Sequence, residues 1–220
     1  MYPLTLLTEA TNIHPLFGDA LKGEPHVFDF SSKNPRTKLW DTENFQDFQD
    51  AVYGELREKD KQWGIGRYLE ERAALLRNYP QMIAEKRVYH TGLDITALPG
   101  TPVFAPIAAT VFDVGKEEGI GNYGGFVVLR HEVGSDVFYS FYGHLLSRHM
   151  VRKGDLLKAG QQFAVIGNGD DSGGWFTHTH LQILTQTAVD QGRIFQGYVT
   201  AEDLKRIEEL FPSPFPLFRY

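Results

Sequence analysis

The stretch His178-Thr-His180-Leu-Gln-Ile-Leu-Thr185 predicts a β-strand that carries two histidines on one face. Its β-branched and aliphatic residues favour a strand, in which residues two apart project to the same side. In a helix the same two side chains would diverge by about 200°. We therefore expect the imidazoles of residues 178 and 180 to point the same way.

A second motif, His90-Thr-Gly-Leu-Asp94, precedes this strand in the sequence. A spacing of four keeps both side chains on one side of an extended segment, and Gly92 with Pro99-Gly100 argues against a helix there. The chain has no cysteine, so only imidazole and carboxylate groups are available to hold a metal. Two imidazoles and one carboxylate form a three-ligand zinc set with a position left for water, which is typical of catalytic zinc.

The residues around these motifs predict an antiparallel β domain over residues 88–189. Short runs rich in Val, Ile, Phe, Thr and Tyr alternate there with glycine, proline and asparagine, as in all-β units. The runs expected to form strands are residues 101–107, 109–115, 124–133, 136–145, 161–167 and 178–185.

Residues 1–87 have a different pattern, which predicts an N-terminal extension with one short strand and two helices. The strand is expected at residues 26–30. Apolar residues three and four apart predict a helix that is capped by Asp41 or Thr42 and ends near Lys59. A second helix is expected over residues 68–78, before Pro80. The whole chain is therefore expected to be α+β, with a helical and irregular extension on a β-rich domain.

Residues 190–220 form the third predicted region. A loop leads into a short helix over residues 201–210, and the chain ends in the aromatic and proline-rich sequence FPSPFPLFRY. We expect this tail to pack on the body of the protein.

Charge and composition exclude several classes of protein. Of the 220 residues, 22 are Lys or Arg and 28 are Asp or Glu, which gives a net charge of −6 and argues against a nucleic-acid or membrane-surface binder. No run approaches the roughly 18 apolar residues of a membrane-spanning helix, so no membrane insertion is expected. The first residues lack the basic and apolar regions of a signal peptide, which predicts a cytoplasmic location unless the chain is a processed, exported form.

Three motifs in order, HTGLD (90–94), YGHL (142–145) and HTHLQI (178–183), resemble the lysostaphin/LytM-type zinc metalloendopeptidases, also called the duplicated hybrid motif fold. The resemblance covers about residues 88–187. It implies that His90, Asp94 and His180 are the ligands of one zinc ion, and that His144 and His178 are an unligated catalytic pair. The family's usual PHLHFE is THTHLQ here, and the preceding loop is GDDSGGWFT, so the substrate groove differs from the family pattern.

A weaker resemblance extends over residues 26–180, from HVFDFS through WGIGRYLEER to the GGW that precedes HTH. These features are similar to the peptidase-like module of bacterial proteins that fuse it to a phosphotransferase-like domain and a class III aminotransferase. The resemblance implies that residues 1–87 belong to this subtype and that the substrate need not be cell-wall peptide.

We predict from these features a zinc-dependent hydrolase of peptide amide bonds. Its expected substrate is a peptidoglycan-type or other short peptide, attacked by water on zinc. Trp175, Tyr123, His131 and Arg67 are candidates for the substrate groove, although His131 and Arg67 also fit structural roles. Two alternatives stay open, a non-catalytic zinc-containing binding or activator module and a cytosolic hydrolase of a small amide metabolite. The sequence does not define an oligomeric state.

Overall fold

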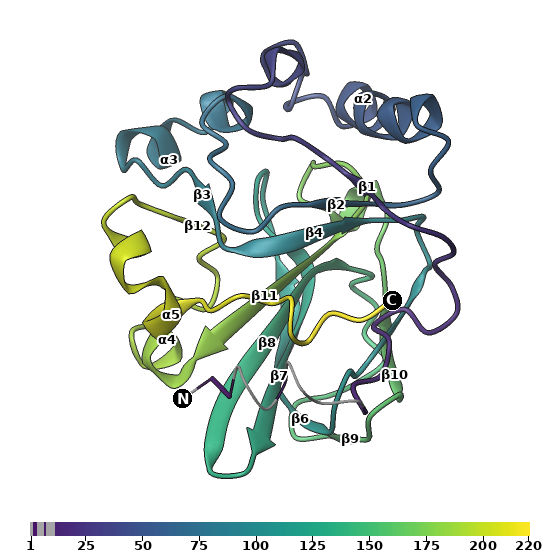
Figure 1. Ribbon diagram of the computed structural model, residues 1–220, viewed down its shortest axis with the longest axis vertical. Helices are drawn as coiled ribbons and strands as arrows, with labels where there is room; N and C mark the ends of the chain where they lie inside the picture. The colour runs from purple at the N-terminus through teal and green to yellow at the C-terminus, as the bar shows by residue number, and fades with distance from the viewer. Residues whose placement is uncertain (1, 4–6, 8–11) are drawn as a thin grey trace.

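The computed structural model describes residues 2–3, 7 and 12–220. A long, twisted sheet runs through the molecule in the strand order β1-β2-β4-β11-β8-β7-β6-β9 (Figure 1). Its neighbouring strands are antiparallel except β1 and β2, which are parallel. The strands of this sheet are β1 (His26–Val27), β2 (Gly64–Gly66), β4 (Gly92–Thr96), β6 (Ala109–Glu117), β7 (Gly124–Val133), β8 (Asp136–Leu145), β9 (Leu156–Leu157) and β11 (Thr179–Thr185).

Two small antiparallel pairs and several short helices complete the fold. The pairs are β10 (Gln162–Val165) with β5 (Pro102–Phe104), and β12 (Tyr198–Val199) with β3 (Tyr89–His90). The helices are η1 (Pro35–Lys38), α2 (Phe45–Glu58), η2 (Leu75–Asn78), α3 (Pro80–Ala84), η3 (Gly169–Asp171), α4 (Gln186–Asp190), η4 (Asp203–Arg206) and α5 (Ile207–Leu210). The predicted α+β class with a β-rich core is confirmed. Among the described residues no helix is long and apolar enough to cross a membrane.

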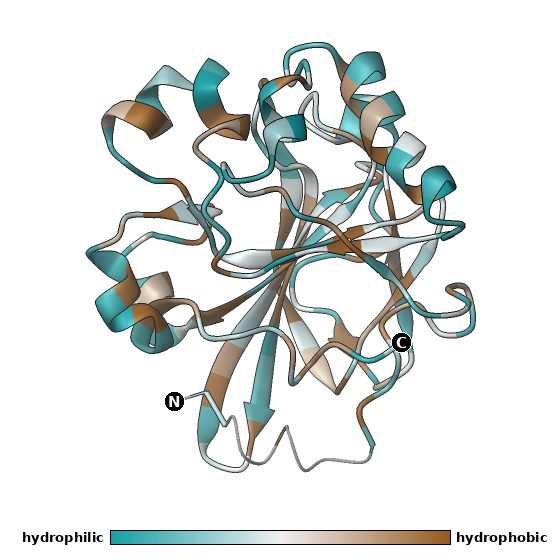
Figure 2. Cartoon of the chain, turned by 45° about the horizontal axis from the view of Figure 1, so that its top comes forward, coloured by the Kyte–Doolittle hydropathy of each residue, from teal (hydrophilic) through white to brown (hydrophobic). Residues whose placement is uncertain are grey.

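The long hairpin of β7 and β8 is the centre of the sheet. Gly134 and Ser135 join the two strands, and Gly134 has φ 61°, which suits the first position of a tight two-residue turn. Alternate residues face opposite sides, so Val127 lies in one hydrophobic cluster and Val128 in another. Figure 2 shows apolar residues along these central strands. Because both faces of the hairpin are buried, its strands hold their register firmly.

The first predicted helix is present as α2, but its cap differs from the prediction. Asn44, not Asp41 or Thr42, is the N-cap residue, and its side chain accepts hydrogen bonds from the backbone N–H groups of Gln46 and Asp47. An asparagine oxygen satisfies two donors that the first helical turn leaves free. The buried apolar residues of α2 belong to a hydrophobic cluster that the extension shares with Trp175 and Phe176 of the β domain, and they are Phe48, Val52 and Leu56.

The prediction of a second helix over residues 68–78 is wrong. Only its last residues form η2, and Leu69 has a positive φ of 57° that no helix contains. The backbone pairs with the β domain instead, because the Leu69 N–H donates to the His90 carbonyl and the Arg72 N–H donates to the Val88 carbonyl. Tertiary hydrogen bonds outweigh the helical propensity of this segment.

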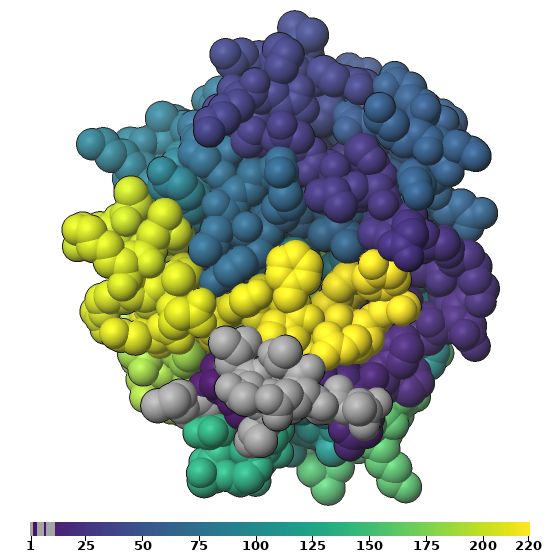
Figure 3. Space-filling view, viewed as in Figure 1, coloured from purple at the N-terminus to yellow at the C-terminus, as the bar shows by residue number. Residues whose placement is uncertain are grey.

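The C-terminal segment lies across the body of the protein, where Figures 1 and 3 show it in yellow. The helix predicted over residues 201–210 is divided into η4 and the single turn α5. In the tail, Phe218 is 5% exposed and its ring contacts the rings of Phe17 and Trp63. The tail thus contributes to the core.

Candidate metal centre

Four segments of the β domain bring the predicted site residues together. Strands β4 and β11 are antiparallel neighbours, and their register places His180 opposite Asp94. On its other side His180 lies opposite Gly143, next to His144 near the end of β8. His90 comes from β3, two residues before β4 begins. Residues distant in sequence thus meet because the sheet pairs these strands.

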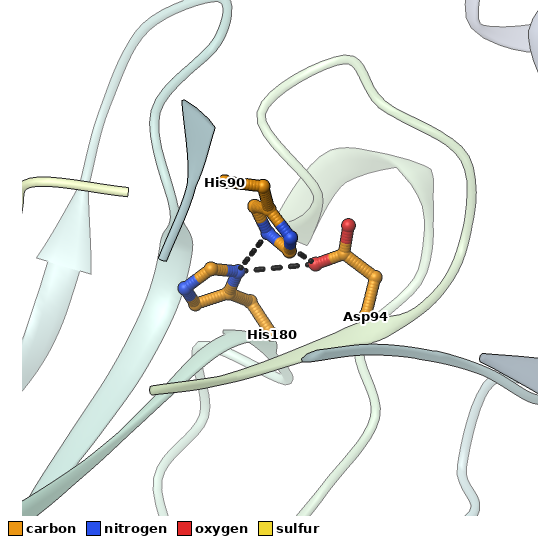
Figure 4. A group of neighbouring side chains, drawn as sticks. All are labelled: His90, Asp94 and His180. Carbon is orange, nitrogen blue, oxygen red and sulfur yellow. Dashed lines mark hydrogen bonds and ion pairs between the residues drawn. The ribbon is translucent and has the colours of Figure 1, made fainter. Parts of the chain in front are cut away.

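The three predicted ligands converge on one point (Figure 4). The distance from His90 Nε2 to His180 Nδ1 is 3.1 Å, and Asp94 Oδ1 lies 3.2 Å from His90 Nε2 and 3.0 Å from His180 Nδ1. Ligand atoms about 2.0–2.2 Å from a tetrahedral zinc ion lie roughly 3.3–3.6 Å apart, a few tenths of an ångström more than these distances. The triangle therefore has the size of one face of a zinc coordination tetrahedron, so the residues present fit this ion.

Hydrogen bonds on the far side of each ring orient the two ligand imidazoles. The His90 Nδ1–H donates to the Arg67 carbonyl at 3.0 Å, which leaves the Nε2 lone pair directed into the triangle. The His180 Nε2–H donates to Gln182 Oε1 at 2.9 Å, which leaves its Nδ1 lone pair directed there. Such outer partners fix the tautomer that a metal requires.

The two unligated histidines lie beside this triangle. The His178 Nδ1–H donates to the Phe176 carbonyl at 2.7 Å, so its Nε2 is the free acceptor, and it lies 3.5 Å from Asp94 Oδ1. The ring centroids of His144 and His178 are 4.2 Å apart. Among the described residues, His144 Nδ1 has no hydrogen-bond partner although it is buried. A buried nitrogen without a partner costs free energy unless a ligand or water satisfies it.

Burial and neighbouring charges favour neutral imidazoles and an ionised carboxylate in this cluster. Burial lowers the pKa of His90 to about 4, with the Arg72 charge acting in the same direction. Burial also lowers the pKa of His144 and of His178. Burial alone would raise the pKa of Asp94, but the charges of His90 and Arg72 hold it well below its usual range. His90 is therefore favoured in its neutral form and Asp94 in its ionised form, which are the forms that bind a metal.

A cavity of about 610 Å³ opens above the cluster. The three proposed ligands and the two unligated histidines line this cavity, and they are His90, Asp94, His180, His144 and His178. The N-terminal extension contributes Leu76, Tyr79 and Met82 to its walls, and the C-terminal segment contributes Phe195 and Tyr198. The volume is that of a site for a small ligand.

Two of the predicted groove residues line this cavity. Trp175 lies in the wall, where its Nε1–H donates to the Tyr79 hydroxyl at 2.6 Å. Tyr123 lies in the wall as well, with its ring centroid 5.1 Å from that of His180. Both side chains are less than 9% exposed. Their positions are therefore fixed by packing.

The side chains of the other two groove candidates lie elsewhere. His131 is fully buried, its Nε2 is 2.7 Å from the Ser140 hydroxyl and its ring stacks on Phe138, so it is a core residue. The Arg67 side chain forms ion pairs with Asp29 and Glu70 and is not among the residues that line the cavity. Only its backbone oxygen touches the site, through His90.

Sequence reasoning missed the residues that support the ligands from outside. Gln182 follows His180 by two positions in the same strand, and this spacing could have identified it, because alternate residues share a face. Arg72 lies in the segment wrongly predicted to be helical, and no sequence signal connects it with Asp94. The Arg72 Nη1 donates to Asp94 Oδ2 at 2.6 Å.

Comparison with known proteins finds similarity over the β domain. Residues 88–191 match the model of Peptidase family M23. An uncharacterized metalloprotease of Haemophilus influenzae is 36% identical over 94 residues, which are 43% of this chain and 18% of that protein. The lipoprotein YgeR of Escherichia coli is 33% identical over 100 residues, which are 45% of this chain and 36% of that protein.

Solved structures are similar to part of the chain. A zinc-containing peptidase from Vibrio cholerae aligns with a TM-score of 0.39 and 30% identity, over 45% of this chain and 28% of that one. In each of these comparisons the match covers well under half of the relative's length.

Proposed function

Because residues 88–191 match the model of Peptidase family M23, we propose that this protein hydrolyses peptide amide bonds at one zinc ion held by His90, Asp94 and His180. The observation that carries the proposal is the triangle of three buried ligand atoms, whose edges are 3.0–3.2 Å. Two imidazoles and one carboxylate are the ligand set of a catalytic rather than a structural zinc site.

The protein's own residues supply the rest of the chemistry. Zinc in such a site polarises a carbonyl group and makes water acidic enough to react near neutral pH. His178 presents an unprotonated Nε2 to the site, so we assign it the role of general base that later returns the proton to the leaving amine. His144, whose Nδ1 lacks a protein partner, is assigned to hydrogen-bond the developing oxyanion or to relay the proton.

The shape of the cavity favours a short substrate. Its walls come in large part from segments outside residues 88–191, among them Tyr79 of the extension and Tyr198 of the C-terminal segment. At about 610 Å³ it accommodates a small ligand rather than a broad polymer surface. We therefore propose a short peptide as substrate, such as a peptidoglycan stem peptide, with a small amide metabolite as the second candidate.

Turnover on purified substrates tests this function. The zinc-loaded protein is incubated with soluble muropeptides and, separately, with a panel of small amides, and new amines are identified by mass spectrometry. We expect release of an amine from one of these sets, and loss of that activity by about 10²–10⁴-fold in His178→Ala. Equal activity of His178→Ala would contradict its role. Binding of muropeptides without any cleavage would instead support a non-catalytic binding module.

A further inference from the structure

A buried ion pair links the N-terminal extension to the metal centre. Arg72 is fully buried, and its Nη1 donates to Asp94 Oδ2 at 2.6 Å. Its Nε donates to Glu70 Oε2 at 3.0 Å, and the Glu70 side chain is itself only 4% exposed. Arg72 therefore binds the carboxylate oxygen that does not face the two ligand imidazoles.

The surroundings hold this guanidinium in one place. Glu70 Oε1 accepts a hydrogen bond from the backbone N–H of Phe30 at 3.0 Å, and the Arg72 guanidinium lies 5.0 Å from the centre of the Phe30 ring. Gly66 leaves the space that the guanidinium occupies, because a Cβ atom there would lie 2.8 Å from Arg72 Nη2. A buried arginine needs partners for its charge, and these contacts hold the Arg72 guanidinium in a single position.

We infer that Arg72 is a positioning residue of the metal centre, which holds Asp94 so that one carboxylate oxygen faces the two ligand imidazoles. This inference rests on the proposed function, because it concerns the ion that His90, Asp94 and His180 bind. A carboxylate with both oxygens free can rotate, whereas one with an oxygen bound to arginine presents the other in a single direction. The β domain thus depends for its ligand geometry on a residue outside residues 88–191.

Charge and orientation must be separated in the test. Removing Arg72 alone would take away a positive charge beside Asp94 and would strengthen zinc binding for that reason alone. The double variant Glu70→Gln with Arg72→Met removes one positive and one negative charge, so the net charge of the cluster does not change. Arg72→Lys keeps the positive charge but loses the planar fork that binds the carboxylate oxygen and Glu70 together.

The control is an arginine with the same kind of contacts at a distance from the site. Arg193 donates to Asp203 at 2.8 Å and lies 5.3 Å from the centre of the Phe211 ring. Arg193→Met loses this ion pair, this cation–π contact and the hydrogen bond from Arg193 Nε to the Gln196 side chain, none of which involves Asp94. Far-ultraviolet circular dichroism and thermal melts establish that each variant is folded.

Zinc affinity, measured by competition with a chelating dye at constant pH, decides the matter without any substrate. We expect the dissociation constant to rise about 10–100-fold in the double variant, to rise less in Arg72→Lys, and to stay within about threefold in Arg193→Met. A folded double variant within threefold of the wild type would overturn the inference. If the double variant does not fold, Arg72→Lys is used instead, and a folded Arg72→Lys protein whose dissociation constant for zinc is within threefold of the wild type would overturn the inference. A wild-type chain that binds no zinc would overturn the proposed function itself, and this role of Arg72 with it.

Discussion

At the residue scale, hydrogen bonds decide which nitrogen of each imidazole is free. His180 is held by Gln182, which accepts from its Nε2 and is itself held by the Thr91 hydroxyl at 2.8 Å. His90 is held by a backbone oxygen, which no side-chain substitution removes. The orientation of His180 is therefore the part of the metal centre most open to a single substitution.

Substitution of Gln182 by leucine tests this support. We expect Gln182→Leu to weaken zinc binding by about tenfold or more, because His180 then loses the acceptor that fixes its tautomer. Titration with a chelating dye measures the effect. Gln162→Leu, in β10 and away from the cavity, is the control. Unchanged zinc affinity in Gln182→Leu would show that packing alone orients His180.

The buried His131 leads us to predict a pH dependence of folding stability that does not involve the metal. Burial lowers its pKa to about 4, whereas in the unfolded chain it is about 6.5. The unfolded state therefore binds more protons between these values, so stability falls as pH drops from about 6.5 to about 4 and by about 3 kcal/mol at most. Urea unfolding at several pH values should show a smaller loss in His131→Gln than in the wild type. If the free energy of unfolding falls equally with pH in the wild type and in His131→Gln, this role of His131 would be contradicted.

At the element scale, the pairing of β4 with β11 brings two of the proposed zinc ligands, Asp94 and His180, together. Gly92 begins β4, and a Cβ atom there would lie 2.6 Å from His180 Cε1 and 2.6 Å from the Leu181 carbonyl oxygen. A side chain at this position must displace either the imidazole or the strand. The glycine of the HTGLD motif is therefore required by the close approach of the two strands.

Gly92→Ala is accordingly expected to reduce both stability and metal content. Thermal melts and metal analysis of the purified variant measure the two effects. Gly54→Ala in the middle of α2 is the matched control, since its new methyl group meets only an arginine side chain at 3.7 Å and should stabilise the helix by about 0.5–1 kcal/mol. A Gly92→Ala protein with full zinc content and an unchanged melting temperature would contradict the proposed crowding.

Elements with a strong local sequence pattern could be predicted, whereas elements shaped by contacts with distant residues could not. The strands β7 and β8 match their predicted bounds at 124–133 and 136–145, because both show strong β-forming runs separated by a turn. Spacing in extended segments also predicted that His90 lies on the same side as Asp94 and His178 on the same side as His180, whereas the choice of His180 as the ligand came from the family resemblance. The segment of residues 68–78 could not be predicted, since its conformation depends on hydrogen bonds to residues 88–90. Arg72 could not be assigned to the site for the same reason.

At the scale of the whole molecule, the extension and the β domain share one hydrophobic cluster. Phe48 of α2 contacts Trp175 and Phe176, which lie just before the HTH motif, with ring centroids 5.4 Å and 5.0 Å apart. Phe30 also contacts Phe176, with ring centroids 5.6 Å apart. The extension is therefore packed into the wall of the cavity and is not a separate unit beside it.

Phe48→Ala tests this shared packing. We expect a loss of about 3–5 kcal/mol in the free energy of unfolding, because Phe48 is fully buried. Tryptophan fluorescence and circular dichroism should report one common urea transition in the wild type. Two separate transitions, with the β domain unaffected by the substitution, would show that the extension folds independently.

Metal analysis of three purified proteins tests the metal centre most directly. The wild type, His178→Ala and His180→Ala are loaded with zinc, dialysed and examined by inductively coupled plasma mass spectrometry. We predict about one zinc ion per chain in the wild type and in His178→Ala, and almost none in His180→Ala, because His180 is one of the three ligands of the triangle whereas His178 is not. Full zinc content in His180→Ala, or a wild type without zinc, would contradict the assignment of His90, Asp94 and His180 as the ligands.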